Sequence, residues 1–206
     1  MARRRAAPSS RPFWGLLLVA AVAGAAPTPR FASLPAAKGI HLEAQAILAA
    51  PAAQVAAVAA DPSAFVELFP ALSARVLGAV AGAPRVEVTM KAPWPVRRVT
   101  WVERVELSPD ADGQGYVIHR VAEPGYYRSM EVTCTVRPRA DGQSDVTYRV
   151  QMEIAGWAPQ WIVRRGIIDG ATRTLDNLER MARRLLPPAP PLAEKQNDRS
   201  GAASPP

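Results

Sequence analysis

A carboxylate and a guanidinium stand where the sequence otherwise predicts a buried surface. In the stretch Arg98–Leu107, Trp101 and Val105 recur at every second residue with Glu103 between them, so Glu103 shares their inward side. A carboxylate is costly to bury alone and needs a partner. Arg120, on the next predicted strand, can face the same side. We therefore predict an internal pair of Glu103 and Arg120; one-residue bulges that turn either side chain outward would instead leave an ordinary exposed pair.

Few other residues have the type and spacing that catalysis or metal binding requires. The only histidines, His41 and His119, have no metal-ligand spacing around them. Cys134 is the only cysteine, which excludes an intrachain disulfide, and its apolar surroundings indicate a small buried side chain more than a thiolate nucleophile. The chain has no Gly-rich phosphate loop, Gly-x-Ser-x-Gly elbow or dinucleotide fingerprint. We therefore predict no metal, no cofactor and no catalytic residue.

Hydrophobic periodicity predicts the elements that would position these residues. Apolar residues alternate over Gly39–Ala49, which predicts a half-buried strand, and two short helices follow at 52–60 and 62–68. The two-residue period then continues and predicts six strands separated by turn residues: Leu72–Val80, Arg85–Lys91, Arg98–Leu107, Gly115–Ala122, Tyr127–Arg137 and Ser144–Ala155. A 3.6-residue period over Pro159–Leu186 predicts one long helix with the apolar stripe Ile168, Ala171, Leu175, Leu178, Ala182 and Leu185. Sequential strands joined by short turns form an antiparallel meander.

The same alternation assigns an inward side to each strand. The inward residues are Val86, Val88, Met90, Val99, Trp101, Val105, Met130, Val132, Cys134, Val136, Tyr148, Val150 and Met152. Methionine and aromatic side chains at such positions belong more often to plain core than to a cavity wall. Around a cavity, this lining would favour an apolar ligand with a few polar anchors.

The two ends of the chain differ from its body. Basic residues precede the apolar run Phe13–Ala26, which is shorter than the roughly twenty residues of a transmembrane helix. We predict a signal peptide over 1–25, a linker over 26–38, a folded domain over 39–186 and a disordered Pro- and Ala-rich tail over 187–206. The protein would then be exported, periplasmic or secreted. An uncleaved membrane anchor or a disordered basic leader is the alternative.

Charge gives little support for nucleic-acid binding. The formal net charge is +7, but four arginines would leave with the leader and the remaining charges form no dense cluster. One face of the long helix is basic, with Arg164, Arg173, Arg180 and Arg183. This face indicates a solvated surface, with transient membrane docking as the alternative.

The order of elements resembles the START-like (SRPBCC) helix-grip superfamily, which includes START lipid-binding domains, polyketide cyclases and dehydratases, and coenzyme-Q-binding proteins. Local sequence agrees at Ala60-Asp61-Pro62-Ser63, at Pro93-Trp94-Pro95-Val96 and at Gly156-Trp157-Ala158-Pro159-Gln160-Trp161. The resemblance implies an α+β fold in which a curved, seven-stranded antiparallel sheet (order β-α-α-β6-α) wraps a long C-terminal helix. It covers about Gly39 to Leu186.

The resemblance also implies a cavity between sheet and helix. Its expected ligand-binding residues are Met90, Trp101, Glu103, Arg120, Met130, Cys134, Tyr148 and Met152. The Glu103–Arg120 pair resembles the polar anchor of some sterol-binding START domains and would hydrogen-bond the polar end of a lipid. The segment Glu123–Met130, with Pro124-Gly125-Tyr126-Tyr127, is either a gate over the cavity or an ordinary hairpin turn.

The expected function is binding or carriage of a hydrophobic small molecule such as a lipid, sterol, quinone or polyketide-like compound. One alternative is a small cavity enzyme of the cyclase or dehydratase type that uses Tyr148 or His119 as acid and base. The other alternative is an interaction module whose core is filled by its own side chains.

Overall fold

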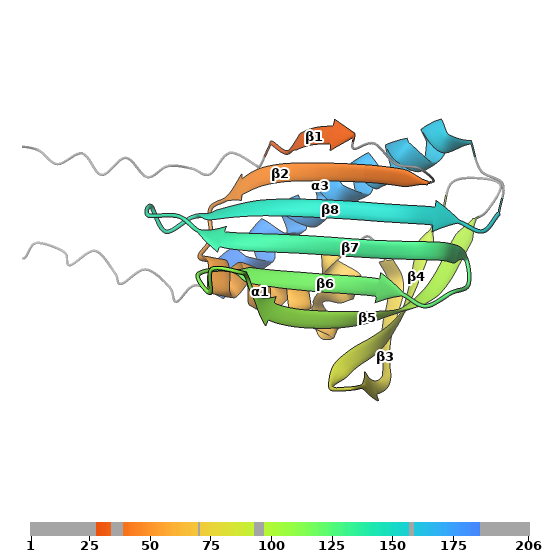
Figure 1. Ribbon diagram of the computed structural model, residues 1–206, viewed down its shortest axis with the longest axis horizontal. Coiled ribbons are helices and arrows are strands. Elements are labelled where there is room, and N and C mark those ends of the chain that lie inside the picture. The colour runs from red at the N-terminus through yellow and green to blue at the C-terminus, as the bar shows by residue number, and fades with distance from the viewer. Residues whose placement is uncertain (1–27, 34–38, 70, 93–96, 157–158, 186–206) are drawn as a thin grey trace, which may run out of the picture.

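The computed structural model describes residues 28–33, 39–69, 71–92, 97–156 and 159–185 (Figure 1). One antiparallel sheet has the strand order β1-β2-β8-β7-β6-β5-β4-β3. Its strands are β1 Arg30–Ser33, β2 Ile40–Leu48, β3 Ala71–Val80, β4 Ala83–Lys91, β5 Arg98–Pro109, β6 Tyr116–Ala122, β7 Tyr127–Pro138 and β8 Ser144–Ile154. From β3 to β8 each strand pairs with the next along the chain, as the predicted meander requires, and β8 also pairs with β2.

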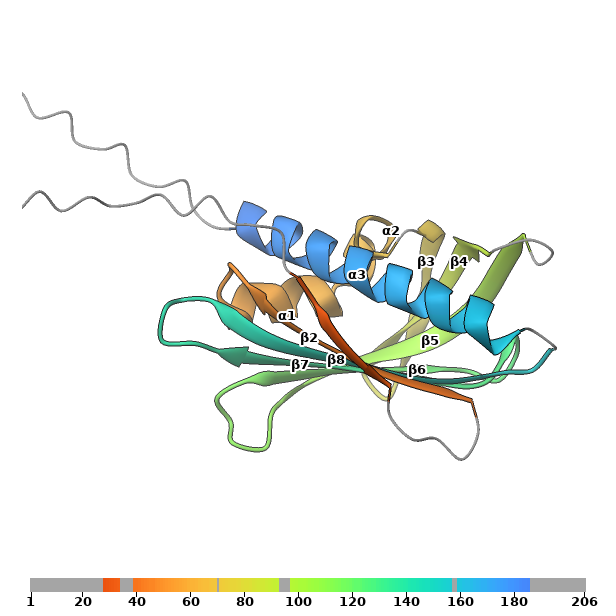
Figure 2. The same ribbon diagram turned by 90° about the horizontal axis from the view of Figure 1, so that it is seen from above.

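The helices gather on the concave face of the sheet. They are α1 Ala52–Ala60, the short 3-10 turn η1 Pro62–Ala64, α2 Phe65–Leu68 and α3 Gln160–Arg184. Figure 2 shows α3 lying along this face, with α1 and α2 on the same side. The side chain of Asp61 accepts the Ser63 backbone N–H at 2.8 Å, which caps the turn between α1 and α2. This arrangement is the predicted helix-grip fold.

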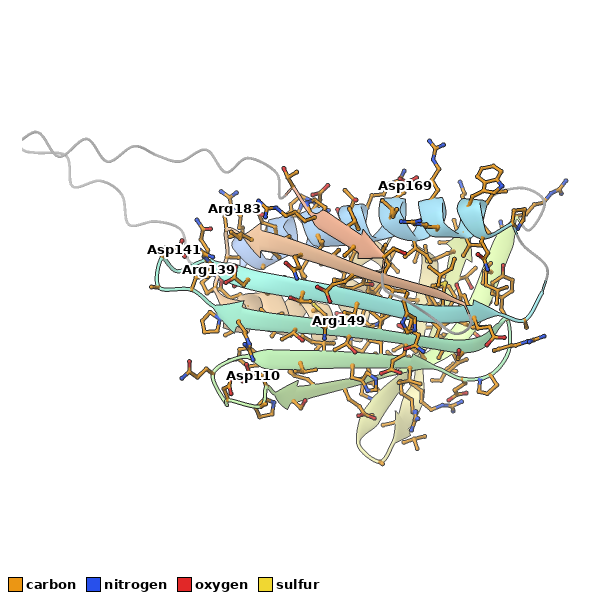
Figure 3. The ribbon with its side chains drawn as sticks, turned by 45° about the horizontal axis from the view of Figure 1, so that its top comes forward. Asp110, Arg139, Asp141, Arg149, Asp169 and Arg183 are labelled. Atoms are coloured by element: carbon orange, nitrogen blue, oxygen red, sulfur yellow. The ribbon has the colours of Figure 1, made fainter. Side chains whose placement is uncertain are left out.

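The alternating strand residues divide as the sequence predicts. Every predicted inward residue is buried or partly buried, and Val86, Val88 and Val136 are fully enclosed. The opposite face is polar: on it, the Arg149 Nε donates to Glu43 at 2.7 Å across β8 and β2 (Figure 3). Because one face buries apolar side chains and the other meets water, a one-residue slip in register would exchange the two sets and is strongly disfavoured.

Two details of the predicted architecture are wrong. The sheet has eight strands, because β1 lies within the predicted linker and pairs with β2 through Phe31 and Ala44. Four residues are too few for alternation to reveal a strand. At the other end, the stripe of α3 stops at Ala182, and Leu185, which follows the last helical residue as its C-cap, is 55% exposed. The predicted signal peptide (1–25) and tail (187–206) lie outside the described residues.

The two halves of α3 differ in what they cover. In the second half Ala171, Leu175, Leu178 and Ala182 are buried against the core, and α1 packs beside them. In the first half, from Gln160 to Gly170, the residues facing the sheet keep part of their surface accessible. Within the described ranges, no helix has both the length and the apolar character needed to cross a membrane.

Candidate functional site

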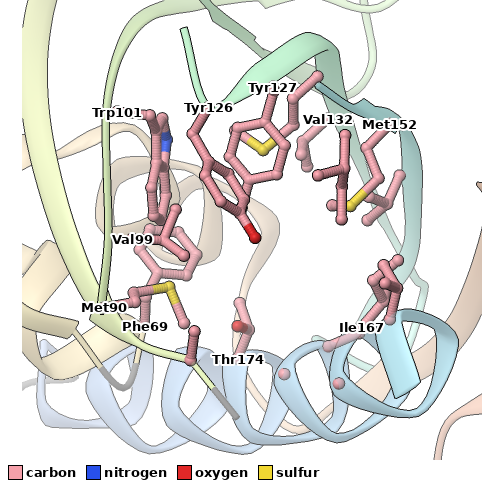
Figure 4. Close-up of a pocket in the computed structure, with 18 of the residues that line it drawn as sticks. Phe69, Met90, Val99, Trp101, Tyr126, Tyr127, Val132, Met152, Ile167 and Thr174 are labelled. Atoms are coloured by element: carbon pink, nitrogen blue, oxygen red, sulfur yellow. The ribbon is translucent and has the colours of Figure 1, made fainter. Parts of the chain in front are cut away.

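The first half of α3 stands off the sheet and leaves a cavity of about 280 Å³ (Figure 4). Its lining is mostly apolar, with a few hydroxyl groups and two cationic side chains. The sheet and its loops contribute Met90, Lys91, Ala92, Val99, Trp101, Arg120, Tyr126, Tyr127, Met130, Val132, Tyr148, Val150, Met152 and Ile154. The helical side contributes Phe69, Pro159, Ile162, Val163, Gly166, Ile167, Gly170, Ala171 and Thr174.

The cavity has an inner and an outer end. α3 follows β8 along the chain, so the two elements diverge into the molecule from their connection. The distance of a residue from this connection, along either element, shows how deep in the cavity it lies. Tyr148 lies six residues before Ile154, or about 20 Å of strand, and Thr174 lies fifteen residues after Pro159, or about 22 Å of helix. Tyr148 and Thr174 therefore line the inner end. Ile154, Pro159, Tyr126 just before β7 and Tyr127 at its start line the outer end.

The Glu103–Arg120 pair is internal, as predicted. Glu103 is fully buried, and Arg120 is 5% exposed. Arg120 donates from Nε to Glu103 Oε1 at 2.9 Å, and its Nη2 donates to the same oxygen. The other oxygen of Glu103 accepts the Trp101 indole N–H at 2.8 Å. These contacts satisfy the buried carboxylate, so the predicted alternative of an exposed pair is wrong.

Arg120 lies between this carboxylate and the aromatic rings of α2. Its guanidinium carbon is 4.0 Å from the centre of the Phe69 ring and 5.0 Å from that of Phe65, which is a cation–π arrangement. Desolvation alone would lower the pKa of Arg120, but the attraction of Glu103, with smaller contributions from Tyr148 and Cys134, raises it. The cation is therefore permanent. Nε and Nη2 make the bonds to Glu103, so Nη1 is left for another partner; the Tyr148 hydroxyl interacts with Arg120, and both residues line the cavity.

Aromatic side chains cluster at the outer end. Tyr127 packs edge-on against Trp101 with ring centres 5.6 Å apart, and Tyr126 packs in the same way on Tyr127 at 5.0 Å. The Ala155 N–H donates to the Tyr126 carbonyl at 3.0 Å, which ties this loop to the end of β8. Burial raises the pKa of both tyrosines, so both are neutral hydroxyls at physiological pH. The segment predicted to be either a gate or an ordinary hairpin turn thus contributes two side chains directly to the cavity wall.

Six of the eight predicted site residues line the cavity: Met90, Trp101, Arg120, Met130, Tyr148 and Met152. Glu103 and Cys134 do not; they lie behind the wall, where Glu103 holds Arg120 and Trp101 in place. Sequence reasoning missed the helical wall, because it assigned α3 a core-facing stripe throughout. The glycines at 166 and 170, four residues apart in a predicted helix, were the available signal.

The thiol of Cys134 is expected to be unreactive in the folded protein. Burial raises its pKa to about 12, only partly opposed by Arg120, so at pH 8 it holds about a thousandfold less thiolate than an ordinary cysteine. The folded state binds this proton more tightly than the unfolded chain, so the contribution of Cys134 to stability is full below pH 9 and declines as the pH rises toward 12. Labelling with a disulfide reagent at pH 8 should be slow in buffer and fast in urea; fast labelling in buffer would contradict this burial.

The histidines lie outside the cavity lining. His119 is on the polar face of β6, where its Nε2 is 2.8 Å from Glu131 Oε1, so it cannot serve as the acid or base considered above. His41 is also absent from the lining. Among the described residues, no group of three His, Cys, Asp or Glu side chains could hold a metal ion.

Half of the predicted basic face of α3 is engaged in ion pairs. Arg180 donates to Glu67 of α2 at 2.5 Å, and Arg183 is 3.5 Å from Glu179. Arg164 and Arg173 are exposed. The face is therefore less uniform than the sequence suggests.

The comparison with protein families identifies this architecture. Residues 39–183 match the family described as "Polyketide cyclase / dehydrase and lipid transport". The chain belongs to this family. Among curated proteins, an uncharacterised protein of Pseudomonas aeruginosa is 29% identical over 99 residues, which cover 44% of this chain and 48% of that protein. The alignment thus spans about half the length of this relative.

Solved structures show the same fold at low sequence identity. A STAR-related lipid transfer protein of Xanthomonas axonopodis is 21% identical, with a TM-score of 0.64 over 77% of this chain and 99% of that one. The Zhui aromatase/cyclase of Streptomyces sp. R1128 is 16% identical, with a TM-score of 0.59 over 70% and 93%. Human StAR-related lipid transfer protein 5 is 10% identical, with a TM-score of 0.61 over 78% and 88%. At these identities the likeness establishes the START-like fold and leaves the ligand open.

Proposed function

We propose that this protein binds and carries a hydrophobic small molecule whose polar end is uncharged. The observation that carries the proposal is an apolar cavity whose inner end holds a buried arginine with one donor nitrogen that Glu103 does not engage. A filled core would leave no such space, which speaks against an interaction module. Lipids, sterols, quinones and polyketide-like compounds all have an apolar body with few polar atoms, and they fit this lining.

The charge of the anchor supports an uncharged polar end. Arg120 is already neutralised by Glu103, so a ligand carboxylate would bring an unbalanced negative charge into a buried site. A hydroxyl or carbonyl oxygen can instead accept a hydrogen bond from Arg120 Nη1 without adding charge. A carbonyl or alcohol end is therefore favoured over a fatty-acid carboxylate.

Native mass spectrometry of the full chain, purified from a lipid-containing host, tests this proposal. We expect a bound mass at one molecule per protein, and organic extraction should release a compound with an apolar body and an uncharged polar end. A protein that stays empty after purification and after incubation with lipid extract would overturn the proposal. An acidic lipid as the dominant ligand would overturn the part that concerns charge.

A cyclase or dehydratase is the competing function, and Tyr148 is its candidate group. Burial, above all, raises the pKa of Tyr148 to about 12, so the phenol is protonated at neutral pH and can donate a proton but not accept one. His119 supplies no base, since it lies on the outer face. Turnover of a polyketide-like substrate that Tyr148→Phe abolishes would favour the enzyme.

We also propose that the protein is exported, as the basic residues and apolar run at its start predict. We propose further that it meets membranes transiently through the first turns of α3. Support for the membrane contact comes from Trp161, which is 69% exposed, and from the exposed Arg164 and Arg165 near it on the helix. Tryptophan favours the membrane interface, and arginines favour anionic headgroups. Co-sedimentation of the full chain with anionic vesicles should fall on Trp161→Ala; unchanged binding would exclude this surface.

A further inference from the structure

Two glycines lie in the part of α3 that lines the cavity. Gly166 and Gly170 both lie within Gln160–Arg184, and both belong to the cavity wall. Glycine is the least favourable residue after proline inside a helix, because it loses the most backbone freedom on folding. Two such residues one turn apart weaken the helix, so a compensating role for them is expected.

Neither usual structural reason for glycine applies here. Neither residue has a positive φ, which other residues rarely adopt. A Cβ atom built at either position would meet no atom within 4 Å, so no other element approaches the helix closely there. Both glycines line the cavity; Gly170 is partly buried, and Gly166, nearer the outer end, is also exposed to solvent.

A buried hydroxyl at the end of this glycine face points to a ligand. Thr174 follows Gly170 by four residues, lies on the same side of the helix, and is 4% exposed. Its hydroxyl makes no hydrogen bond within the described residues, whereas Thr172 donates to the Ile168 carbonyl at 2.9 Å, the usual recourse of a helical threonine. Figure 4 shows Thr174 directed from α3 into the cavity.

We propose that Gly166, Gly170 and Thr174 form a track for an elongated, unbranched apolar chain that lies directly against the α3 backbone. Its uncharged polar end would lie at the inner end of the cavity, where the Thr174 hydroxyl and Arg120 Nη1 can both donate to it. This inference deepens the proposed function and rests on it. It names the class of ligand: a straight-chain alcohol, aldehyde, ketone or ester.

The geometry of the track sets a length. From Gly166 to Thr174 the helix advances about 12 Å at its rise per residue. A chain that covers this length contacts both glycines, whereas a shorter chain anchored at Thr174 passes only Gly170. Added side chains at 166 and 170 should therefore affect long and short ligands differently.

The test uses the full chain and displacement of the neutral fluorescent probe N-phenyl-1-naphthylamine by hexanol, dodecanol or hexadecanol. We expect wild-type protein to bind dodecanol and hexadecanol more tightly than hexanol. Gly166→Leu should weaken the two long alcohols at least tenfold and leave hexanol within about twofold, because only the long chains reach it. Gly170→Leu should weaken all three alcohols. The control is Asp169→Leu, which adds the same side chain at an exposed position on the outward side of the helix (Figure 3). It should leave the affinities for all three alcohols unchanged.

Stability distinguishes a track from a structural glycine. Gly170→Ala should raise the melting temperature by a few degrees, since alanine favours the helix and its Cβ has room. A lower melting temperature would mean that the glycine serves the fold and would overturn the inference. Alcohol binding that is unchanged in Gly166→Leu and Gly170→Leu, with wild-type protein binding normally, would overturn the track and leave the proposed function standing. Wild-type protein that binds neither probe nor alcohols would overturn both.

Discussion

Replacing Glu103 by alanine is expected to lower the free energy of unfolding by about 3–5 kcal/mol, because it leaves Arg120 as an uncompensated buried charge. The guanidinium is 5% exposed, and burial raises the pKa of its neighbours Tyr148 and Cys134, so neither supplies an anion in place of the carboxylate. The Trp101 indole N–H loses its acceptor as well. Urea unfolding followed by tryptophan fluorescence measures the loss.

The control is the same substitution at Glu131, a carboxylate that is paired with a histidine on the outer face of the sheet. Glu131 is about half exposed and contacts His119, so Glu131→Ala should change the free energy of unfolding by less than about 1 kcal/mol. A Glu103→Ala variant that is as stable as Glu131→Ala would show that water reaches Arg120 and that the pair is not internal.

The order of elements was predictable because each element repeats one simple pattern over many residues. The inward residues of β7 and β8 alternate over eleven or twelve positions, and the antiparallel register then places Cys134 beside Tyr148 and Val132 beside Val150. Glu103 followed from the same phase, because it interrupts an otherwise apolar side of β5. Where a pattern is short, as in the four residues of β1, the sequence carries too little signal.

The cavity itself was not predictable from alternation. Facing inward is common to Cys134 and Met130, yet only Met130 reaches the open space, because the helices fill the interior at one end of the sheet and not at the other. That difference depends on how closely α3 approaches the sheet, a tertiary property. A helical period describes α3 as one uniform stripe, although its first half lines a cavity and its second half closes the core.

Replacing both members of the internal pair by uncharged residues is expected to separate the contribution of the pair to stability from its contribution to ligand binding. In the double variant Glu103→Gln, Arg120→Met no charge remains buried, and the glutamine oxygen can still accept the Trp101 N–H. The free energy of unfolding should therefore recover by at least about 2 kcal/mol relative to Glu103→Ala, since buried ion pairs are often replaceable by uncharged side chains. The cavity should persist, because methionine fills much of the volume of the arginine stem.

Ligand binding should not recover with stability. Dodecanol loses the charged donor at Arg120 Nη1, and a hydrogen bond to a charged group contributes about 1.5–3 kcal/mol, so its affinity should fall about tenfold or more. Dodecane has no polar end and should bind wild-type protein and the double variant alike, which makes it the matched control in the same displacement assay. If both ligands bind the double variant as they bind wild-type protein, Arg120 serves only the fold. If both are lost together, the cavity has closed, and Arg120 is needed for its shape. A loss confined to dodecanol assigns the polar end of the ligand to Arg120, and Glu103 then acts by holding that arginine in place.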